Sequence, residues 1–258
     1  EILERYDNIQ EYLDHQIKVE KSADKKEKLL GYKSTIDGLL VSVVNIDCDF
    51  VREKLGPKFQ ENPSDIKMAK KVFGFMLNGK CTDDPLWLQA GETILQNEPD
   101  FGIAKALGAK FKAAGQLEKS ESYFNQALEL ADDPGAKADM YMQLGSLTEK
   151  KGQKSSAREL YRKAVNTDPS KREAYTAIGN LYYGSFNQCA GKQDIVKDRA
   201  VYIAAHAMFK RAGNSSAMAS AKAQFPSKEE IFTLNYEKGQ SLTVGCWIGE
   251  SITIDTRD

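Results

Sequence analysis

Apolar side chains recur every three or four residues through most of the chain, which is the spacing of amphipathic helices. Between residues 2 and 19 they form one stripe, made of Ile2, Tyr6, Ile9, Leu13 and Ile17. A second stripe follows a charged break at residues 22–28, and its members are Leu29, Ile36, Leu40 and Val43. We therefore expect two helices in this region, packed as an antiparallel hairpin.

Capping residues and prolines mark three more helices. Asp47 or Asp49 can cap a third helix that ends at Gly56-Pro57, because a carboxylate accepts hydrogen bonds from the free N–H groups of a first turn. Asn62-Pro63 and Asp84-Pro85 each place a proline where a helix can begin. These signals predict two helices that end near residues 79 and 99, and therefore a helix pair over residues 62–99.

One pattern of residue types returns at a regular interval in the middle of the chain. It contains an aromatic, a Leu-Gly or Ile-Gly pair, a small residue and a second aromatic, and Gly145 and Gly179 hold the same place in successive copies. Its clearest copy is made of Tyr141, Leu144, Gly145, Gly152, Ala157, Tyr161, Ala164 and Pro169. The flanking copies are made of Ala104, Leu107, Gly108, Phe111, Ser120, Phe124 and Ala127, and of Tyr175, Ile178, Gly179 and Tyr182. In residue types and in its period, this pattern resembles the tetratricopeptide repeat (TPR), a helix pair that stacks on its neighbours.

The third copy is interrupted. Its second helix carries Ala205, Phe209 and Ala212 at the expected offsets, but Phe209 follows Tyr161 by clearly more than one repeat length, so extra chain is inserted. The inserted stretch is at about residues 184–198. Long ordered loops in solenoids are often functional. We expect this one to fold back, either toward the concave groove of the repeats or toward the strands predicted at the C-terminus, both described below.

The period changes from helical to alternating after Pro226. Phe232, Leu234 and Tyr236 alternate with polar residues, and so does a later group made of Leu242, Val244, Cys246, Ile248, Ile252 and Ile254. Alternation predicts strands, and Gly249-Glu250 suits a two-residue hairpin turn. Ser227 and Glu230 have the spacing of a capping box for one short turn of helix before the strands.

These observations predict a mainly α fold, and the resemblance implies a TPR-like right-handed solenoid of antiparallel helix pairs with a small C-terminal β-hairpin. We expect an N-terminal hairpin with a third helix at residues 1–61 and a degenerate repeat-like pair at 62–99. TPR repeats with the insertion follow at 100–225, and a β-hairpin cap at 226–258. Small residues let neighbouring helices approach and aromatics fill the remaining space, so stacking produces one continuous core.

The resemblance also implies a binding surface. In TPR proteins the first helices of the repeats line a concave groove that takes an extended peptide or a partner helix. The matching groove positions are Lys105, Ala109, Lys112, Met142, Ser146, Glu149, Thr176, Asn180 and Tyr183. Some relatives bind a peptide carboxylate with a clamp of Lys, Asn and Arg side chains. Here Ala109 follows Lys105, Gln143 replaces an Asn, and Glu173 and Ala177 replace the basic pair, so we expect no such clamp.

Composition and motifs give no sign of catalysis. The chain is 41% hydrophobic and 28% charged with a formal net charge of −1, which does not favour binding to nucleic acid or to acidic membranes. No apolar run is long enough to span a bilayer. His15 and His206 are the only histidines. We interpret His15 as an exposed helix residue, and His206 has no nucleophile or partner base nearby in sequence. No catalytic or phosphate-binding motif is present. We expect no enzyme activity, no metal and no cofactor.

The four cysteines are Cys48, Cys81, Cys189 and Cys246. Antiparallel packing of the third and fourth helices would bring Cys48 close to Cys81, and Cys189 could reach Cys246 if the strands pack on the insertion. Disulfides at these two pairs require an oxidising compartment. The alternative is that all four are buried or free thiols.

The interpretation we favour is a non-catalytic scaffold that binds a peptide or protein in the groove. The alternative is a glycan-binding or nutrient-capture protein with an aromatic platform built by Trp247 and Tyr183. The segments Gly79-Lys80-Cys81, 198–205 and Gly245-Cys246-Trp247-Ile248 also make the chain similar to uncharacterised exported TPR proteins of Bacteroidetes-type bacteria. That similarity implies an extracytoplasmic location, with the cytoplasm as the alternative. Because the sequence begins with Glu1 and not methionine, we interpret it as a mature or trimmed form.

Overall fold

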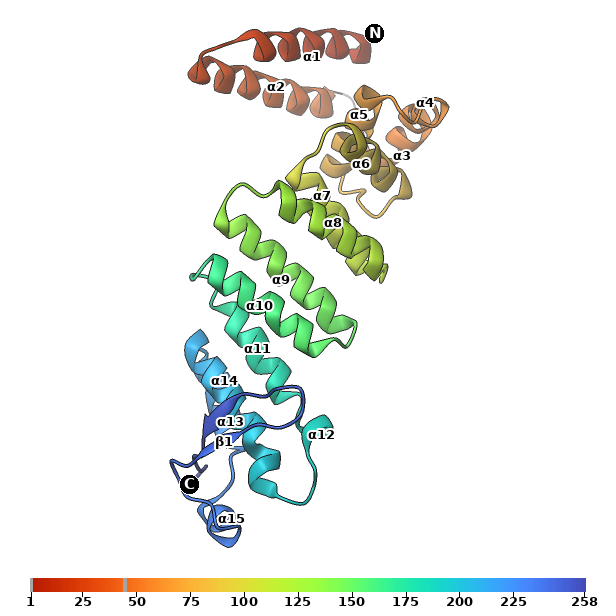
Figure 1. Cartoon of the computed structure of the whole chain (residues 1–258). Coiled ribbons are helices and arrows are strands. Elements are labelled where there is room, and N and C mark those ends of the chain that lie inside the picture. The colour runs from red at the N-terminus through yellow and green to blue at the C-terminus, as the bar shows by residue number, and fades with distance from the viewer. Residues whose placement is uncertain (1, 44–45) are drawn as a thin grey trace. The chain divides into compact units, whose positions relative to one another are not determined.

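The computed structural model describes residues 2–43 and 46–258, and it divides the chain into two compact units, Glu1–Asn97 and Glu98–Asp258. Figure 1 shows the order of the elements along the chain. The division lies close to the expected boundary between the degenerate pair and the repeats. Each unit is described separately.

The first unit begins with the expected helical hairpin. Helices α1 (Ile2–Val19) and α2 (Ala23–Val43) contact each other, and an ion pair between Lys33 and Asp14 joins them. The charged break is shorter than expected, because α2 already begins at Ala23. Leu13 and Leu40 are buried, whereas Tyr12, Tyr32 and Leu39 are each more than half exposed.

The next helical stretch is longer than expected. Asp47 caps α3 (Cys48–Phe50) by accepting a hydrogen bond from the backbone N–H of Phe50. The helical course continues through a π-helical turn, η1 (Val51–Leu55), into α4 (Gly56–Glu61). The prediction that the helix ends at Gly56-Pro57 was wrong, because Pro57 lies in the first turn of α4, where no N–H donor is needed.

Helices α5 (Ile66–Asn78) and α6 (Pro85–Asn97) form the expected pair. The start of α5 was predicted wrongly at Asn62-Pro63. Asp65 is the cap instead, because its carboxylate accepts a hydrogen bond from the N–H of Met68. The rings of Phe73 and Trp87 stack between the two helices, with centroids 4.6 Å apart.

The second unit contains three successive helix pairs (Figure 1). They are α7 (Phe101–Ala113) with α8 (Leu117–Leu130), α9 (Pro134–Lys150) with α10 (Lys154–Thr167), and α11 (Glu173–Tyr183) with α13 (Ile195–Ala212). The prediction of a mainly helical, solenoid-like fold with a small C-terminal β-hairpin is confirmed.

Each pair is closed by a glycine that faces an aromatic ring. A Cβ atom placed on Gly108, Gly145 or Gly179 would lie 2.5–2.6 Å from a ring carbon of Phe124, Tyr161 or Phe209, respectively. No side chain fits at that separation, so the glycine is what allows the two helices of a pair to approach. This close approach is the physical basis of the repeated sequence pattern.

The insertion folds onto its own repeat. It contains the short helix α12 (Phe186–Cys189), and α13 then begins after the cap Asp194. The buried carboxylate of Asp198 accepts hydrogen bonds from the backbone N–H groups of Gly191 and Lys192. The added chain is therefore held against the start of α13.

The C-terminal segment, residues 226–258, departs most from expectation. After α14 (Ser215–Lys222), the capping box of Ser227 and Glu230 starts a short helix, α15 (Lys228–Thr233), as predicted, but this helix continues into the residues expected to form a strand. The prediction that residues 232–236 form a strand was therefore wrong. The apolar residue that suggested alternation there, Phe232, is 83% exposed.

Strands β1 (Ser241–Thr243) and β2 (Ser251–Thr253) pair antiparallel, with Leu242 opposite Ile252. The predicted two-residue turn at Gly249-Glu250 was wrong, because residues 244–250 form a longer loop between the strands. Cys246 in this loop has a positive φ of 65°, a left-handed conformation that a regular strand does not contain.

Candidate functional site

The first-helix face is the name we use for the nine predicted groove residues on α7, α9 and α11. The structure brings two of them together, because the ammonium group of Lys112 on α7 donates hydrogen bonds to Ser146 Oγ (2.9 Å) and Gln143 Oε1 (3.1 Å) on α9. Burial, with a smaller contribution from nearby Lys150, lowers the pKa of Lys112. Neighbouring repeats thus share a polar surface at this point.

The other members of the face have varied surroundings. Lys105 Nζ lies 5.7 Å from the ring centroid of Phe101, and Glu149 accepts a hydrogen bond from the hydroxyl of Tyr161 (2.8 Å). Burial and this carboxylate raise the pKa of Tyr161. Asn180 and Ala109 are exposed, whereas Met142, Ser146 and Thr176 are half-buried.

Tyr183 and Trp247 were expected to build an aromatic platform in the glycan alternative. Tyr183 instead packs edge-on against Tyr202 of α13, with centroids 5.1 Å apart. Trp247 packs near Tyr182 and donates a hydrogen bond from Nε1 to Ser185 Oγ (3.2 Å). Both rings are half-buried against the core of the second unit, so they do not form the platform that the alternative needs.

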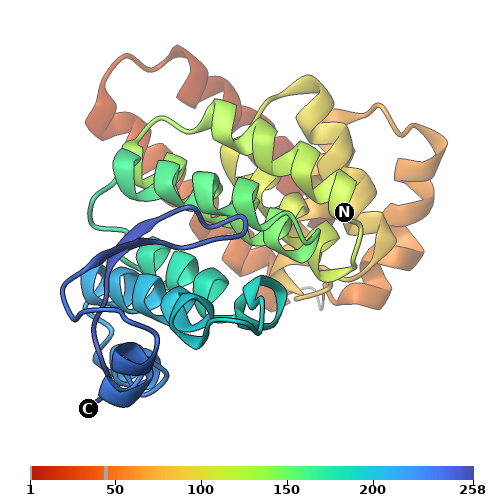
Figure 2. The same ribbon diagram turned by 60° about the horizontal axis from the view of Figure 1, so that its bottom comes forward.

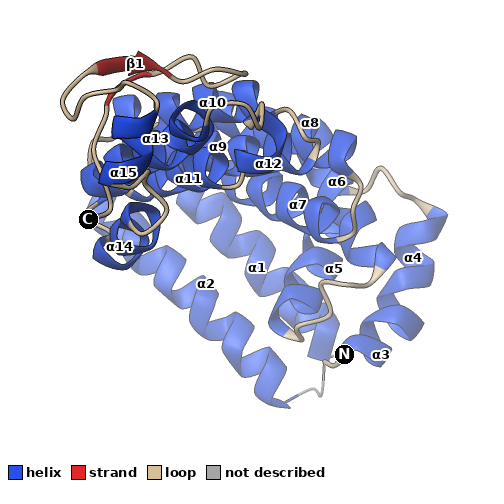
Figure 3. Cartoon of the chain, turned by 90° about the horizontal axis from the view of Figure 1, so that it is seen from below, coloured by secondary structure: helices blue, strands red, loops and turns tan. Residues whose placement is uncertain are grey.

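The C-terminal segment forms hydrogen bonds with α10 and α11 through residues outside the first-helix face. Glu250 accepts hydrogen bonds from the hydroxyl of Tyr182 (2.9 Å) and from Arg162 of α10, and Arg158 of α10 donates to the carbonyl oxygen of Ile248 (2.6 Å). Burial and the carboxylate raise the pKa of Tyr182 to about 12, so its hydroxyl stays a donor. Figures 2 and 3 show the hairpin lying over α10 and α13.

The structure pairs all four cysteines. Cys48 is bonded to Cys81 with Cα atoms 5.8 Å apart, and Cys189 to Cys246 with Cα atoms 5.3 Å apart. These separations are typical of disulfides. The first bond joins the start of α3 to the turn that follows α5, and the second joins the insertion to the loop between β1 and β2.

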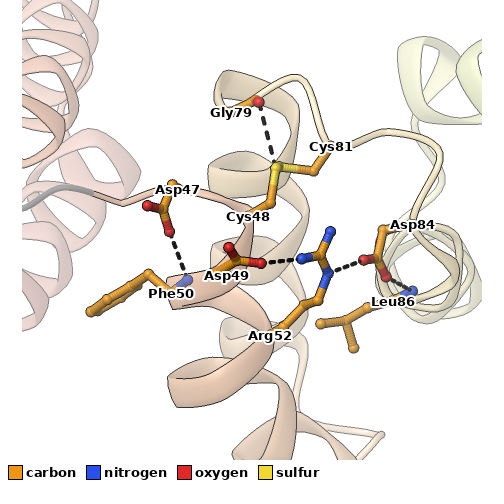
Figure 4. Close-up of a disulfide and its surroundings, with 9 residues drawn as sticks. All are labelled: Asp47, Cys48, Asp49, Phe50, Arg52, Gly79, Cys81, Asp84 and Leu86. Carbon is orange, nitrogen blue, oxygen red and sulfur yellow. Dashed lines mark hydrogen bonds and ion pairs between the residues drawn. A yellow bond between two sulfur atoms is a disulfide. The ribbon is translucent and has the colours of Figure 1, made fainter.

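Figure 4 shows the surroundings of the first disulfide. Arg52 lies between two carboxylates, with Nε 2.6 Å from Asp84 and its other end paired with Asp49. A Cβ atom on Gly79 would lie 3.0 Å from the sulfur of Cys81. The glycine therefore leaves room for the bond at the end of α5.

Two open cavities lie in the second unit. One, of about 780 Å³, lies between the insertion and α15 and is lined by residues such as Phe186, Ile195, Glu230 and Arg257. The other, of about 770 Å³, is lined by Val165, Asn166, Pro169, Arg172, Tyr175 and Arg211; we call it the arginine cavity. The sequence pattern indicated Tyr175 and Pro169 only as packing residues. One sequence signal could have pointed to this cavity, because Arg211 follows Phe209 closely and can reach the aromatic position of the same repeat.

Among the described residues, no three His, Cys, Asp or Glu side chains gather in a way that could hold a metal ion. Within the same part of the chain, no helix is both long and apolar enough to cross a membrane.

Solved structures with a similar course of the chain are distant in sequence. MamA is 16% identical over 67% of this chain and 90% of its own, with a TM-score of 0.47. YrrB, described as a TPR protein with an unusual peptide-binding site, is 15% identical over 70% and 92%, with a TM-score of 0.39. A TPR protein from Parabacteroides merdae is 14% identical over 90% and 95%, with a TM-score of 0.39.

A comparison with curated proteins finds no relative that matches. The sequence itself matches one family model. The model described as "Tetratricopeptide repeat" matches residues 138–171, which cover most of α9, all of α10 and the turn that follows. This stretch includes Gly145 and Tyr161, which face each other closely across the two helices of the pair. Residues 138–171 are therefore identified as a tetratricopeptide repeat.

Proposed function

We propose that this chain is a non-catalytic scaffold that binds a protein or peptide partner on the first-helix face. Stacked helix-pair repeats place equivalent positions of successive first helices in a row, and such rows are the surfaces that repeat proteins use for binding. The C-terminal segment forms hydrogen bonds with Arg158, Arg162 and Tyr182, and none of these belongs to the first-helix face. This supports the first-helix face as the surface that takes a partner.

The observation that carries the proposal is the position of Lys112. Its ammonium group has three N–H donors, and the two oxygen atoms that it contacts, on Gln143 and Ser146, are both neutral. Lys112 is half-buried, and burial lowers the pKa of its ammonium group. An oxygen atom of a bound peptide would supply a third acceptor, and a charge-assisted hydrogen bond of this kind is worth about 1.5–3 kcal/mol.

Site-specific crosslinking in a host lysate tests the proposal. A photoreactive residue at Ala109 or Asn180, both exposed on first helices, should capture the same protein. The matched controls are Ser122 and Asn125, which are exposed on α8, and they should capture much less of it. Lys112→Ala should reduce capture at Ala109 by about tenfold. Equal capture from both sets of positions, or no effect of Lys112→Ala, would contradict the proposal.

We also propose that the chain works in an oxidising compartment outside the cytoplasm. The support is that its cysteines form two pairs at disulfide separation, and that such bonds persist in oxidising environments and are rare in the cytosol. Thiol titration of denatured, unreduced protein from its natural host is the test. Four free thiols would end this part of the proposal without affecting the binding face.

A further inference from the structure

The arginine cavity is lined by none of the nine residues of the first-helix face. Its lining comes from the end of α10, the turn at Pro169, the start of α11 and the end of α13. Val165 is buried and Tyr175 is half-buried. The remaining polar residues of the lining are exposed, and they are Asn166, Arg172 and Arg211. The guanidinium of Arg211 lies over the ring of Tyr175, 5.7 Å from its centroid.

The two arginines of this cavity differ from the others in the second unit. That unit contains six arginines, and four of them form ion pairs with carboxylates of Glu159, Glu230 or Glu250. These four are Arg158, Arg162, Arg199 and Arg257. Arg172 and Arg211 have no carboxylate partner among the residues that the structure describes, and they line the same cavity.

The acidic residues close to this cavity in sequence, Asp168 and Glu173, form no ion pair with either arginine. The carboxylate of Asp168 accepts a hydrogen bond from the N–H of Ser170 (2.9 Å). Glu173 lies 3.9 Å from the ammonium group of Lys171. No acidic residue is among those that line the cavity. Two positive guanidinium groups therefore share a space whose lining carries no negative charge.

We propose that the arginine cavity binds a carboxylate group carried by a peptide segment of a protein partner. A guanidinium presents N–H donors in a planar fork that matches a carboxylate. Val165, Pro169 and the Tyr175 ring form an apolar wall beside the two charges, and this wall suits the carbon atoms that carry the carboxylate. A free inorganic anion would leave the wall without a contact.

The preceding repeat contains a natural comparison. Lys163 Nζ lies 5.9 Å from the ring centroid of Tyr141, and Lys163 stands in the same place after Tyr161 as Arg211 after Phe209. Tyr141 and Tyr175 hold equivalent positions in the two repeats. The position equivalent to Arg172 is Ala138, so the preceding repeat has one cation where the third repeat has two. Lys163 is therefore a matched control for Arg211.

Nuclear magnetic resonance of the arginine Nε–Hε groups tests the proposal directly. The probes are the capped peptides acetyl-Gly-Glu-Gly-amide and acetyl-Gly-Gln-Gly-amide, together with acetate and inorganic phosphate, at low ionic strength. We expect the signals of Arg172 and Arg211 to shift in a saturable way with the glutamyl peptide and not with the glutaminyl peptide. No saturable shift with the glutamyl peptide would overturn the proposal. Tighter binding of phosphate would overturn the choice of carboxylate, and equal affinity for acetate would overturn the choice of a peptide.

Variants separate this site from general surface charge. Arg172→Gln and Arg211→Gln should each weaken binding of the glutamyl peptide by about tenfold, whereas Lys163→Gln should leave it unchanged. Arg172→Lys keeps the charge and loses the planar fork, so it should show an intermediate loss. Far-UV circular dichroism shows whether each variant remains folded, and a well-folded double variant that binds like the wild type would overturn the proposal.

Discussion

In the repeat core of the second unit, the rings of Phe124, Tyr161 and Phe209 lie against glycines in the facing helix. In the C-terminal segment, apolar residues such as Ile248 and Ile254 are also buried, but polar groups and a disulfide add anchors to α10, α11 and the insertion. The first region is closed by glycines and rings at a regular place in each repeat, whereas the second depends on partners that are far away in sequence. The two regions should therefore respond to different substitutions.

The largest effect is expected from removing the disulfide of the C-terminal segment. Cys189 and Cys246 are 57 residues apart, and closing a loop of that length contributes up to about 4 kcal/mol in the chain-entropy account. Replacing both with serine should lower the free energy of unfolding by up to this amount and expose residues 226–258 to proteases first. Urea unfolding and limited proteolysis measure the two results. Unchanged stability and an unchanged cleavage pattern would show that the segment does not depend on this bond.

The next effect tests the repeat core. A side chain at Gly145 would overlap the ring of Tyr161, so Gly145→Val should destabilise the second unit by about 3 kcal/mol through overpacking. The control is Gly74 in α5, where an added Cβ meets nothing within 4 Å. Gly74→Ala should stabilise its own unit by about 0.5–1 kcal/mol. Urea unfolding measures both changes, and similar destabilisation by the two would contradict the role given to the close approach.

A smaller effect tests the polar anchor. Glu250 contacts Tyr182 and Arg162 at a half-buried site, so Glu250→Gln should cost about 1–2 kcal/mol. The matched control is Glu159, which contacts Arg158 and Arg162 from the solvent side and is 52% exposed. Glu159→Gln should cost less than about 0.5 kcal/mol. Equal costs would mean that burial of the carboxylate is unimportant for the anchor.

The smallest effect is a pH dependence near the C-terminal segment. Burial lowers the pKa of His206, with added repulsion from Lys222 and Lys210 and a weaker opposing attraction from Asp255. Below the ordinary value of about 6.5, the unfolded chain binds a proton that the folded protein binds less readily, so stability should fall as the pH falls. Above that value this contribution disappears.

Urea unfolding between about pH 5 and 8 measures this dependence. His206→Gln should remove part of the slope below about pH 6.5, while His15→Gln, at an exposed position on α1, is the control. A slope that is the same in both variants would rule out His206 as its source.

Residues in the repeats could be predicted from sequence because each position depends on neighbours at fixed spacing. Gly145 and Tyr161 have the same separation along the chain as Gly108 and Phe124. The boundaries at Asn62-Pro63 and Gly56-Pro57 were predicted wrongly, because proline suits several places in a first turn and only tertiary packing selects one. Phe59 is buried in α4, so the helix continues past Pro57 and packs this ring against the core.

The contacts of the candidate sites were harder to predict from the sequence than the repeats. Lys112 was identified as a groove residue from its place in the repeat, but its contacts with Gln143 and Ser146 depend on how two repeats stack. Arg172 and Arg211 lie on opposite sides of the insertion in sequence, so no local pattern brings them together. The same is true of Glu250, whose partner Tyr182 lies 68 residues away.

The insertion shows how a solenoid can change length without changing its core. Gly179 faces Phe209 as closely as Gly145 faces Tyr161, although much more chain separates the first two than the second two. The connection between the two helices of a repeat is thus a position where chain can be added, provided that groups such as Asp198 and Cys189 fasten it. For protein engineering, residues 184–194 mark a place to graft a recognition loop onto a scaffold that already tolerates one.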